Sequence, residues 1–245
     1  MIRLHHLLIA FPIMTTLVFA HPQSEEQFVP AESAPLHYLL ALPEGYTPDG
    51  EPLPLLLFLH GGGESGSDLE KVKRHGPPKL IEAGRNFPFI VVSPQNPGSA
   101  AFWDEDVLIR LLDHLQATLN VDSDRIYLTG LSRGGYGAWM LALENPGRFA
   151  AFIPISGAAP SPYAAWLKDL PTWVFHGALD PVIPVTESER MVAAIQARGG
   201  DVRLTVYPDA KHDAWTATYD NPEIYEWLLQ HHRSQRPVKP KPASP

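Results

Sequence analysis

The chain has 245 residues, a formal net charge of −8 and no cysteine. This length suits a single α/β domain that buries its core without cross-links. The lack of cysteine excludes disulfides, thiolate nucleophiles and cysteine-based metal sites. The acidic balance, with no cluster of Lys and Arg before the C-terminal tail, argues against a nucleic-acid partner.

The N-terminus resembles a secretory leader. Arg3 precedes an apolar run from Leu7 to Ala20 that ends in small residues. The run is shorter than the ~20 residues that span a bilayer, and it contains Pro12. We expect residues 1–20 to be a signal peptide, so that the protein is exported to the periplasm or beyond and is not inserted in the membrane after cleavage. An uncleaved signal anchor is the alternative.

Regular elements are expected across residues 36–235. Residues 21–35, which are polar and rich in proline, are expected to be a loosely held lead-in, and residues 236–245 a disordered Pro/Lys tail. The expected strands cover residues 36–42, 53–59, 89–93, 125–129, 149–156, 172–176 and 202–207. The expected helices cover residues 77–84, 104–119, 133–144, 186–198 and 222–232.

The order of these elements predicts the fold class. Residues 53–59 are apolar almost throughout, which is typical of a strand that is covered on both faces. Strands and helices alternate along the chain, so we expect one α/β domain with a doubly wound, mostly parallel sheet and helices on both faces. A capping box, Thr186 to Glu189, marks the start of one of these helices.

A serine between glycines follows the strand at 125–129. Residues 130–134, Gly-Leu-Ser-Arg-Gly, form a G-x-S-x-G pattern between a strand and a small-residue helix. Lifting a serine hydroxyl clear of the backbone requires a sharp, strained turn, and side chains two residues away would collide with neighbouring elements. The helix that follows directs N–H groups and its positive dipole end at the serine. The pattern predicts Ser132 as a nucleophile; a simple Gly/Ser turn is the alternative.

A serine nucleophile needs a base, and the base needs an acid that orients it. In this strand–turn–helix setting the acid and then the histidine follow in chain order, each after a later strand. Asp180 follows the strand at 172–176, and His212 follows the strand at 202–207. Both lie at the carboxyl ends of strands, where parallel sheets place their sites. We therefore predict a catalytic triad of Ser132, Asp180 and His212.

Other acids and histidines are given structural roles. Asp169 precedes its strand and so lies at the wrong edge of the sheet, whereas Asp209 and Asp213 flank the predicted base and shape or solvate its loop. His60 and His176 end buried strands and are expected to hydrogen-bond to nearby backbone.

Acyl transfer also needs N–H donors aimed at the developing oxyanion. The turn after Ser132 supplies the N–H of Arg133. The second donor is expected from the glycine loop after residues 53–59, with Gly62 assigned first and Gly63 second. A flexible glycine turn is the alternative interpretation of that loop.

Together these motifs resemble those of the α/β-hydrolase superfamily. They are most similar to secreted esterases of the polyhydroxybutyrate depolymerase, feruloyl esterase and "predicted peptidase" group. The matching stretches are Leu57 to Gly66, Ser93 to Gln95 with Trp103, Val121 to Ser132, Phe175 to Asp180, and Lys211 to Trp215. The resemblance implies the α/β-hydrolase fold and no metal or cofactor.

The chain departs from these families in one respect, because they usually carry Met after the serine, where this chain has Arg133. A cation at this position favours an anionic or polar substrate. Related dienelactone hydrolases use a cysteine nucleophile, and the lack of cysteine disfavours that activity.

The resemblance also bears on the pocket. Lids in this fold are usually inserted after the strand that here ends at Ser156, and residues 157–171 are too few for a large helical cap. We expect little or no cap and an open site. Trp103 and Trp215, near the loops of the triad, are predicted to bind substrate by stacking; burial as packing residues is the alternative.

The leading hypothesis is an exported serine hydrolase that cleaves short-chain or aryl carboxylic esters, either small or attached to a polysaccharide or polyester. A serine peptidase or aminopeptidase with the same triad is a second hypothesis. A non-catalytic binding protein on the same scaffold is a third, and an intact triad argues against it. The sequence does not specify an oligomeric state.

Overall fold

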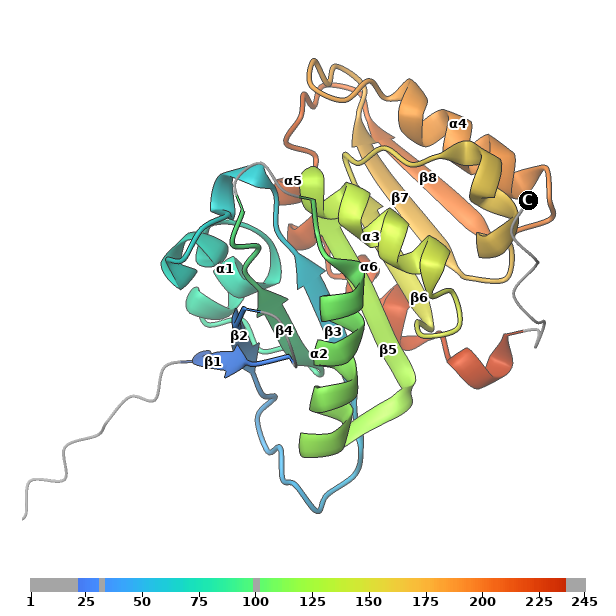
Figure 1. The fold of residues 1–245 in the computed structure, drawn as a ribbon. Helices are drawn as coiled ribbons and strands as arrows, with labels where there is room; N and C mark the ends of the chain where they lie inside the picture. Colours follow the sequence, from blue (N-terminus) through green and yellow to red (C-terminus); the bar gives the residue numbers. More distant parts are fainter. Residues whose placement is uncertain (1–21, 31–33, 99–101, 237–245) are drawn as a thin grey trace, which may run out of the picture.

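The computed structural model describes residues 22–30, 34–98 and 102–236, which build an eight-stranded sheet with helices on both faces (Figure 1). The strands are β1 (Ser24–Phe28), β2 (Leu36–Ala41), β3 (Leu53–Leu59), β4 (Ile90–Pro94), β5 (Val121–Leu131), β6 (Ala151–Ile155), β7 (Thr172–Gly177) and β8 (Val202–Tyr207). Their order in the sheet is β1-β2-β4-β3-β5-β6-β7-β8. β1–β2 and β2–β4 are antiparallel pairs, and the pairs from β4 to β8 are parallel. The predicted mostly parallel sheet is confirmed.

Two groups of helices cover the two faces of the sheet (Figure 1). The helices are α1 (Gly76–Glu82), α2 (Glu105–Thr118), α3 (Arg133–Glu144), α4 (Thr186–Gln196), α5 (Trp215–Asp220) and α6 (Glu223–Leu229), with short 3-10 helices η1 (Gly62–Glu64), η2 (Leu69–Arg74), η3 (Ser161–Leu167) and η4 (Arg233–Gln235). Buried side chains of α2, α3 and α4 belong to one hydrophobic cluster. Those of α1, α5 and α6 belong to a second cluster on the other face.

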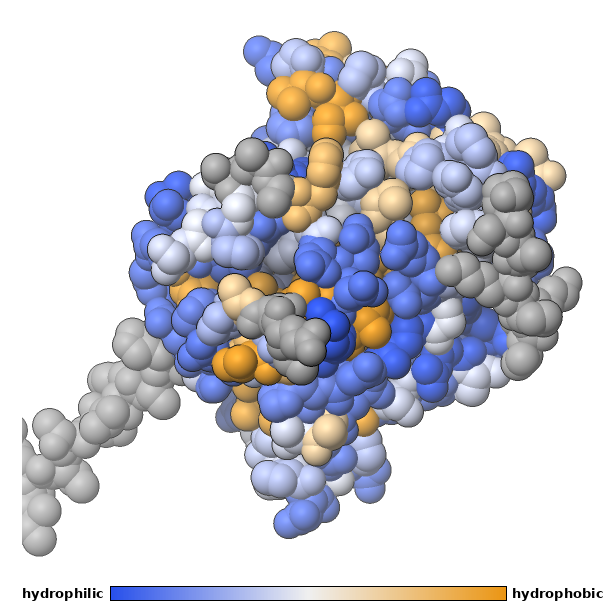
Figure 2. All heavy atoms as spheres, viewed as in Figure 1, coloured by the Kyte–Doolittle hydropathy of each residue, from blue (hydrophilic) through white to orange (hydrophobic). Residues whose placement is uncertain are grey.

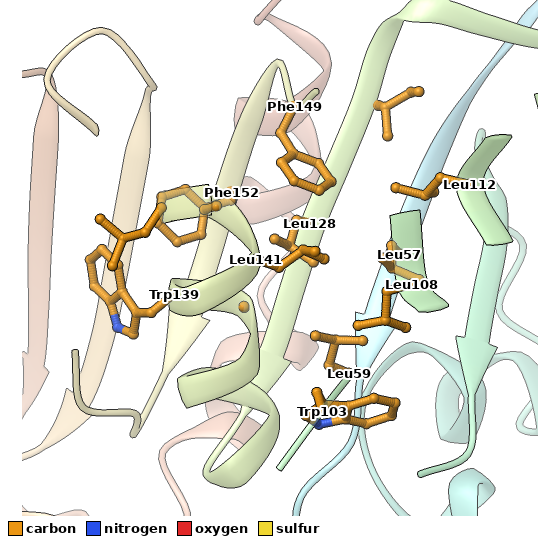
Figure 3. Packing of buried hydrophobic residues seen from close by; sticks show 14 of the residues in the cluster. Leu57, Leu59, Trp103, Leu108, Leu112, Leu128, Trp139, Leu141, Phe149 and Phe152 are labelled. Carbon is orange, nitrogen blue, oxygen red and sulfur yellow. The ribbon is translucent and has the colours of Figure 1, made fainter. Parts of the chain in front are cut away.

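The continuous apolar run of β3 is explained by its place inside the sheet, where both faces are covered. Because side chains alternate along a strand, Leu55, Leu57 and Leu59 enter the first cluster, part of which is drawn in Figure 3. Leu56 and Phe58 enter the second cluster. All five are fully buried, and each contributes roughly 1.5–3 kcal/mol of transfer free energy. The strand that leads to the predicted oxyanion loop is therefore fixed from both sides.

The lead-in differs from the expected loose segment. Residues 24–28 form the edge strand β1, which pairs along its whole length with β2. Just before it, the buried side chain of Gln23 donates hydrogen bonds to the carbonyl oxygen of Pro78 and to Glu82. Backbone pairing stabilises this strand, and its sequence, Ser-Glu-Glu-Gln-Phe, is polar except for Phe28, so no apolar pattern predicted it. The predicted leader, residues 1–20, lies outside the described residues.

Two helical predictions need correction, and one helix was not predicted. The helix expected from Thr186 forms, but the structure shows no side-chain cap at its start, so the predicted capping box is wrong. The backbone of Pro184 and Val185 accepts the first N–H groups instead. The helix expected at 222–232 is the shorter α6, and the 3-10 helix η4 follows it. No helix was predicted at the position of α5, which begins three residues after His212.

The first residue of the predicted tail, Arg236, lies within the described chain and is held by hydrogen bonds. Arg236 donates hydrogen bonds to the backbone carbonyls of Asp169, Pro146 and Phe149 and so ties the end of the described chain to the sheet. Residues 237–245 of the expected tail lie outside the described residues. Within the described ranges, no helix is both long and apolar enough to cross a bilayer.

Candidate active site

The turn between β5 and α3 has the strained geometry that the glycine pattern predicted. Ser132 has φ 53° and ψ −117°, a conformation that side-chain-bearing residues rarely adopt. A Cβ atom on Gly130 would lie 2.2 Å from the carbonyl oxygen of Gly134, and one on Gly134 would lie 1.9 Å from that of Leu59. Both positions therefore require glycine, and the first turn of α3 is held directly against the end of β3.

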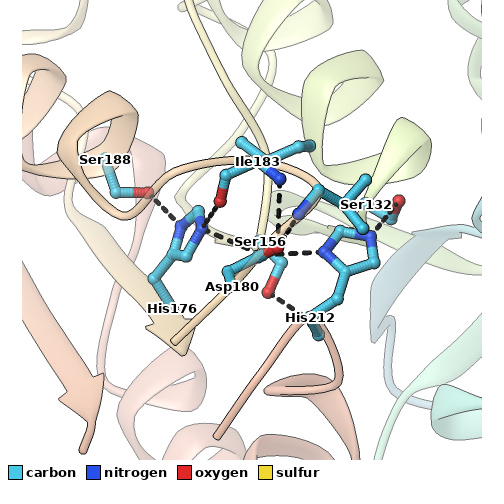
Figure 4. A network of polar contacts seen from close by, with 8 residues as sticks. Ser132, Ser156, His176, Asp180, Ile183, Ser188 and His212 are labelled. Carbon is cyan, nitrogen blue, oxygen red and sulfur yellow. Dashed lines mark hydrogen bonds and ion pairs between the residues drawn. The ribbon is translucent and has the colours of Figure 1, made fainter. Parts of the chain in front are cut away.

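The structure brings Ser132, His212 and Asp180 together (Figure 4). The Oγ atom of Ser132 lies 2.9 Å from Nε2 of His212. The Nδ1 atom of the same ring lies 2.7 Å from Oδ2 of Asp180. Ser132 follows β5, Asp180 follows β7 and His212 follows β8, so the three side chains come from the carboxyl ends of three parallel strands, as predicted.

The surroundings of Asp180 assign the proton positions. Burial raises the pKa of Asp180, but hydrogen bonds from His212 and from the backbone N–H groups of Ile183 and Val182 outweigh this effect, and the net pKa lies below its ordinary value. An ionised carboxylate only accepts hydrogen bonds, so Nδ1 of His212 must carry a proton. Its Nε2 is then the acceptor for the Ser132 hydroxyl, which is the arrangement a general base requires.

The competing acids have the structural environments expected of them. Both carboxylate oxygens of Asp169 contact the Lys168 ammonium, at 2.6 and 2.7 Å, beside the start of β7. Asp213 accepts hydrogen bonds from the backbone N–H and the hydroxyl of Thr216 and so caps the first turn of α5. Neither carboxylate contacts the imidazole of His212 in these bonds.

The glycine loop after β3 is organised by His60, which is almost fully buried. Its Nδ1 donates to the carbonyl oxygen of Gly61 at 2.6 Å, and its Nε2 accepts the backbone N–H of Asn96 at 2.9 Å. Burial is the largest cause that lowers the pKa of His60; the bond to Gly61 raises it, the charge of Arg133 lowers it, and the net value is about 4. A neutral ring therefore fixes the loop, and the expected backbone bonding of His60 is confirmed.

Arg133 lies across this loop. A Cβ on Gly62 would lie 3.0 Å from an Nη atom of Arg133, and Nη1 lies 3.4 Å from the hydroxyl of Ser65. At Gly63 a Cβ would meet nothing within 4 Å. The side chain of Arg133 thus lies over Gly62, and Gly63 is open on that side, so the loop with the predicted donors lies beside the turn between β5 and α3.

His176 has a second, unpredicted relation to the site. Its Nε2 donates to the carbonyl oxygen of Ile183 at 2.9 Å, which confirms the expected backbone bond, and its Nδ1 then accepts the hydroxyl of Ser188 at 2.7 Å. Because Ile183 N–H donates to Asp180, the fully buried ring stabilises the loop that presents the acid. Its Nε2 also lies 3.2 Å from Oδ2 of Asp180. In the sequence, the signal for this contact was that His176 and Asp180 lie four residues apart.

The two tryptophans predicted to bind substrate have different surroundings. Trp103 is buried against His60, with ring centroids 4.8 Å apart, and against Gly137. This burial favours the alternative of a packing residue, and the substrate-binding role of Trp103 stays a prediction. Trp215 is half-buried, and its ring meets that of His212 edge to face, 5.1 Å between centroids. Its role as a substrate-binding residue stays a prediction.

Exposed apolar side chains surround the acid loop. Leu179 and Val182, on either side of Asp180, are 58% and 64% exposed. Figure 2 shows apolar atoms on the surface over this loop, between β7 and α4. Exposed side chains of this size on a site-bearing loop favour contact with an apolar part of a ligand. Within the described ranges, no group of three or more His, Asp or Glu could hold a metal ion.

Comparison with protein families agrees with this geometry. Residues 33–216 match the model of a family named Esterase, described as "Putative esterase". A solved structure of a thermostable esterase is 32% identical, with a TM-score of 0.74, over 86% of this chain and 63% of that chain.

Curated relatives include both an esterase and a peptidase. The bifunctional acetylxylan esterase/xylanase of Neocallimastix patriciarum is 28% identical over 144 residues, 56% of this chain and 20% of that protein. Dipeptidyl-peptidase 5 of Porphyromonas gingivalis is 25% identical over 210 residues, 65% of this chain and 30% of that protein. The chain thus spans less than a third of either relative.

Proposed function

The chain belongs to the Esterase family and has the α/β-hydrolase fold, and from this premise we propose that it is an exported serine hydrolase that cleaves carboxylic esters with Ser132, His212 and Asp180. The observation that carries the proposal is the continuous contact from Ser132 Oγ through His212 to a buried carboxylate of lowered pKa. A serine in a strained turn with this set of partners is equipped for nucleophilic attack.

In the proposed acylation step, Ser132 Oγ attacks the ester carbonyl carbon while Nε2 of His212 takes the hydroxyl proton. Asp180 stabilises the resulting imidazolium through Nδ1. The N–H groups of Arg133 and of Gly62 or Gly63 stabilise the oxyanion, each by about 3–4 kcal/mol of barrier. Collapse of the tetrahedral intermediate breaks the bond to the alkoxide, which leaves as the alcohol with the proton from His212.

Deacylation uses the same groups in the same order. Water attacks the acyl carbon as His212 takes one of its protons, and a second tetrahedral intermediate forms. Its collapse releases the carboxylic acid, and Ser132 Oγ regains its proton from His212. No group beyond the chain, the ester and water is needed to balance the reaction.

The surroundings of the site favour an accessible ester. Only η3 lies in the connection between β6 and β7, so a large cap is absent from this part of the chain, which the structure describes in full. Exposed Leu179 and Val182 border the acid loop. We propose short-chain or aryl acyl esters as substrates, small or attached to a polymer, and the similarity to an acetylxylan esterase/xylanase supports a polysaccharide.

A peptidase activity is the second candidate, favoured by the similarity to dipeptidyl-peptidase 5. Attack on an amide would use the same serine, base and oxyanion donors, so the site geometry alone serves both reactions. The leaving group distinguishes the two reactions. An amine departs only after it takes a proton from His212, whereas an aryl alcohol depends less on that proton.

The deciding experiment compares a short-chain aryl ester with the matched aryl amide, using the wild-type protein and Ser132→Ala. We expect ester hydrolysis that falls by about 10⁴-fold or more in the variant, with little amide hydrolysis. Amide turnover at a comparable rate would establish the peptidase instead. A folded protein without turnover of either would support a binding protein. Export is tested by N-terminal sequencing of protein from the periplasm of an expressing host, which should begin near His21.

A further inference from the structure

Two serines in the described part of the chain share a rare backbone conformation. Ser132 and Ser156 are the only residues other than glycine in residues 22–30, 34–98 and 102–236 with positive φ, at 53° and 46°. Both contact His212: Ser132 through the imidazole Nε2, and Ser156 through the backbone carbonyl. The first is the predicted nucleophile, and no prediction from the sequence involved the second beyond its place at a strand end.

Ser156 links the strands that carry the site. It follows β6 directly and is fully buried. Its N–H donates to the carbonyl oxygen of Phe175 in β7 at 2.9 Å, and its hydroxyl donates to that of His212 at 3.0 Å (Figure 4). The preceding residue, Ile155, accepts the N–H of Ser132 at 2.9 Å. One short segment therefore contacts the main chain of both the nucleophile and the base.

The segment has little freedom to move. A Cβ on Gly157 would lie 2.6 Å from the carbonyl carbon of Gly135 and 2.8 Å from the backbone nitrogen of Tyr136. A Cβ on Gly135 would lie 2.5 Å from the carbonyl oxygen of Ile155. The end of β6 is thus packed against the first turn of α3. Backbone contact therefore fixes the position of Ser156 relative to the turn at Ser132.

The hydroxyl is not needed merely to pair a buried carbonyl. The carbonyl oxygen of His212 also accepts the N–H of Ala214, at 2.9 Å. At positive φ, glycine would avoid the steric cost that a serine Cβ incurs. A strained serine at a site where glycine fits the backbone better points to a role for its side chain.

We propose that Ser156 is a positioning residue, whose hydroxyl fixes the backbone of His212 so that the imidazole lies between Asp180 and Ser132. This inference rests on the proposed function, since it assigns Ser156 to the same serine-hydrolase mechanism. The hydroxyl touches no substrate and transfers no proton. It acts on the rate because a base held at the correct distance and angle gives more productive encounters with the serine proton.

Two substitutions separate the hydroxyl from the strain. Ser156→Ala removes the hydroxyl and keeps the Cβ, whereas Ser156→Gly removes both. We expect kcat for an aryl ester to fall about tenfold in both variants, with KM unchanged. The melting temperature should fall in Ser156→Ala but be maintained or raised in Ser156→Gly, because glycine relieves the positive φ. Ser93→Ala is the matched control, since Ser93 is a fully buried serine of β4 whose hydroxyl has no hydrogen-bond partner among the described residues.

The second readout is the rate at which a fluorophosphonate modifies Ser132, which depends on His212 but requires no ester substrate. A tenfold slower modification of Ser156→Gly supports the positioning role even if the wild-type protein hydrolyses no ester, in which case only the ester proposal fails. Wild-type rates in Ser156→Gly overturn the positioning role. So does a loss of rate that parallels a loss of melting temperature in both variants, and so does a wild-type Ser132 that does not react.

Discussion

The two sides of Ser132 are built around one buried histidine each. On the oxyanion side, His60 bonds to Gly61 and to the backbone of Asn96. On the acid side, His176 bonds to Ile183 and Ser188. Both rings have both nitrogens hydrogen-bonded to groups other than Ser132, whereas the partly exposed His212 has Nε2 directed at Ser132. Of these three histidines, only His212 has a nitrogen that faces the serine.

The two sides differ in what they present. The loop fixed by His60 offers backbone N–H groups beside a cation, Arg133, which suits a developing negative charge. The loop fixed by His176 offers the carboxylate of Asp180, which suits the imidazolium that forms on His212. In the proposed mechanism, opposite charges are thus stabilised on opposite sides of the serine, and a similar buried ring supports each side.

The strongest test of this division acts on the acid side. Asp180→Asn should lower kcat for an aryl ester by about 10⁴-fold. The amide group lacks the negative charge and can donate to Nδ1, which leaves the Nε2 proton of His212 facing the Ser132 hydroxyl. The steady-state kcat and the rate of Ser132 modification by the fluorophosphonate should fall together. Asp213→Asn is the matched control, because that carboxylate caps α5; an equal loss in the control would refute the assignment of Asp180.

The oxyanion side is tested through acid stability. The folded-state pKa of His60 is about 4, below the unfolded value of about 6.5, so at lower pH the unfolded chain binds a proton that the native state does not. The native state should therefore be fully stable with respect to this group above pH ~6.5 and lose up to about 3 kcal/mol as pH falls toward 4. Because the pKa of Asp180 is lowered, this group adds a further loss of stability only when the pH falls below the ordinary carboxyl pKa of about 4.

Urea unfolding at pH 7, 5.5 and 4.5 measures this slope. His60→Gln should flatten it between pH 6.5 and 4.5, since glutamine does not titrate. The exposed His114 of α2 provides the control, and His114→Gln should leave the slope as it is in the wild-type protein. An unchanged slope in His60→Gln would mean that another group carries the acid sensitivity of this side.

The sequence identified the site where chemistry imposes a local pattern. Ser132 needs glycines two residues away on both sides, and Asp180 and His212 follow strands in a fixed order. Those requirements are visible in one dimension. The backbone bonding of His60 and His176 was predictable for the same reason, because both end strands that are buried on two faces.

The features that the sequence missed depend on contacts between distant segments. The polar strand β1 forms through backbone pairing with β2, which no side-chain periodicity reveals. The burial of Trp103 follows from the close approach of Gly137 and His60. The positive φ of Ser156 follows from packing of β6 against α3, whereas its residue type alone predicts an ordinary backbone.

The smallest expected effect lies at the residue that joins the two sides. The ring of Trp215 meets His212 at 5.1 Å and His75 at 5.7 Å between centroids, and His75 in turn lies 3.8 Å from Glu64 of the oxyanion loop. The Trp215 Nε1 is buried and has no hydrogen-bond partner among the described residues, so phenylalanine loses no hydrogen bond there. Trp215→Phe should change kcat/KM by less than about threefold, and Trp215→Ala by about tenfold, the value of one aromatic contact.

A comparison of two esters distinguishes substrate binding by Trp215 from orientation of His212. If the ring binds substrate by stacking, as the sequence predicted, Trp215→Ala should raise KM more for a feruloyl ester than for an acetyl ester of the same alcohol. If the ring only orients His212, kcat should fall equally for both esters and KM should stay constant, because the base serves every substrate alike. The first result would make Trp215 part of the binding surface. The second would place it with Ser156 and His176, as a third support of the reactive groups.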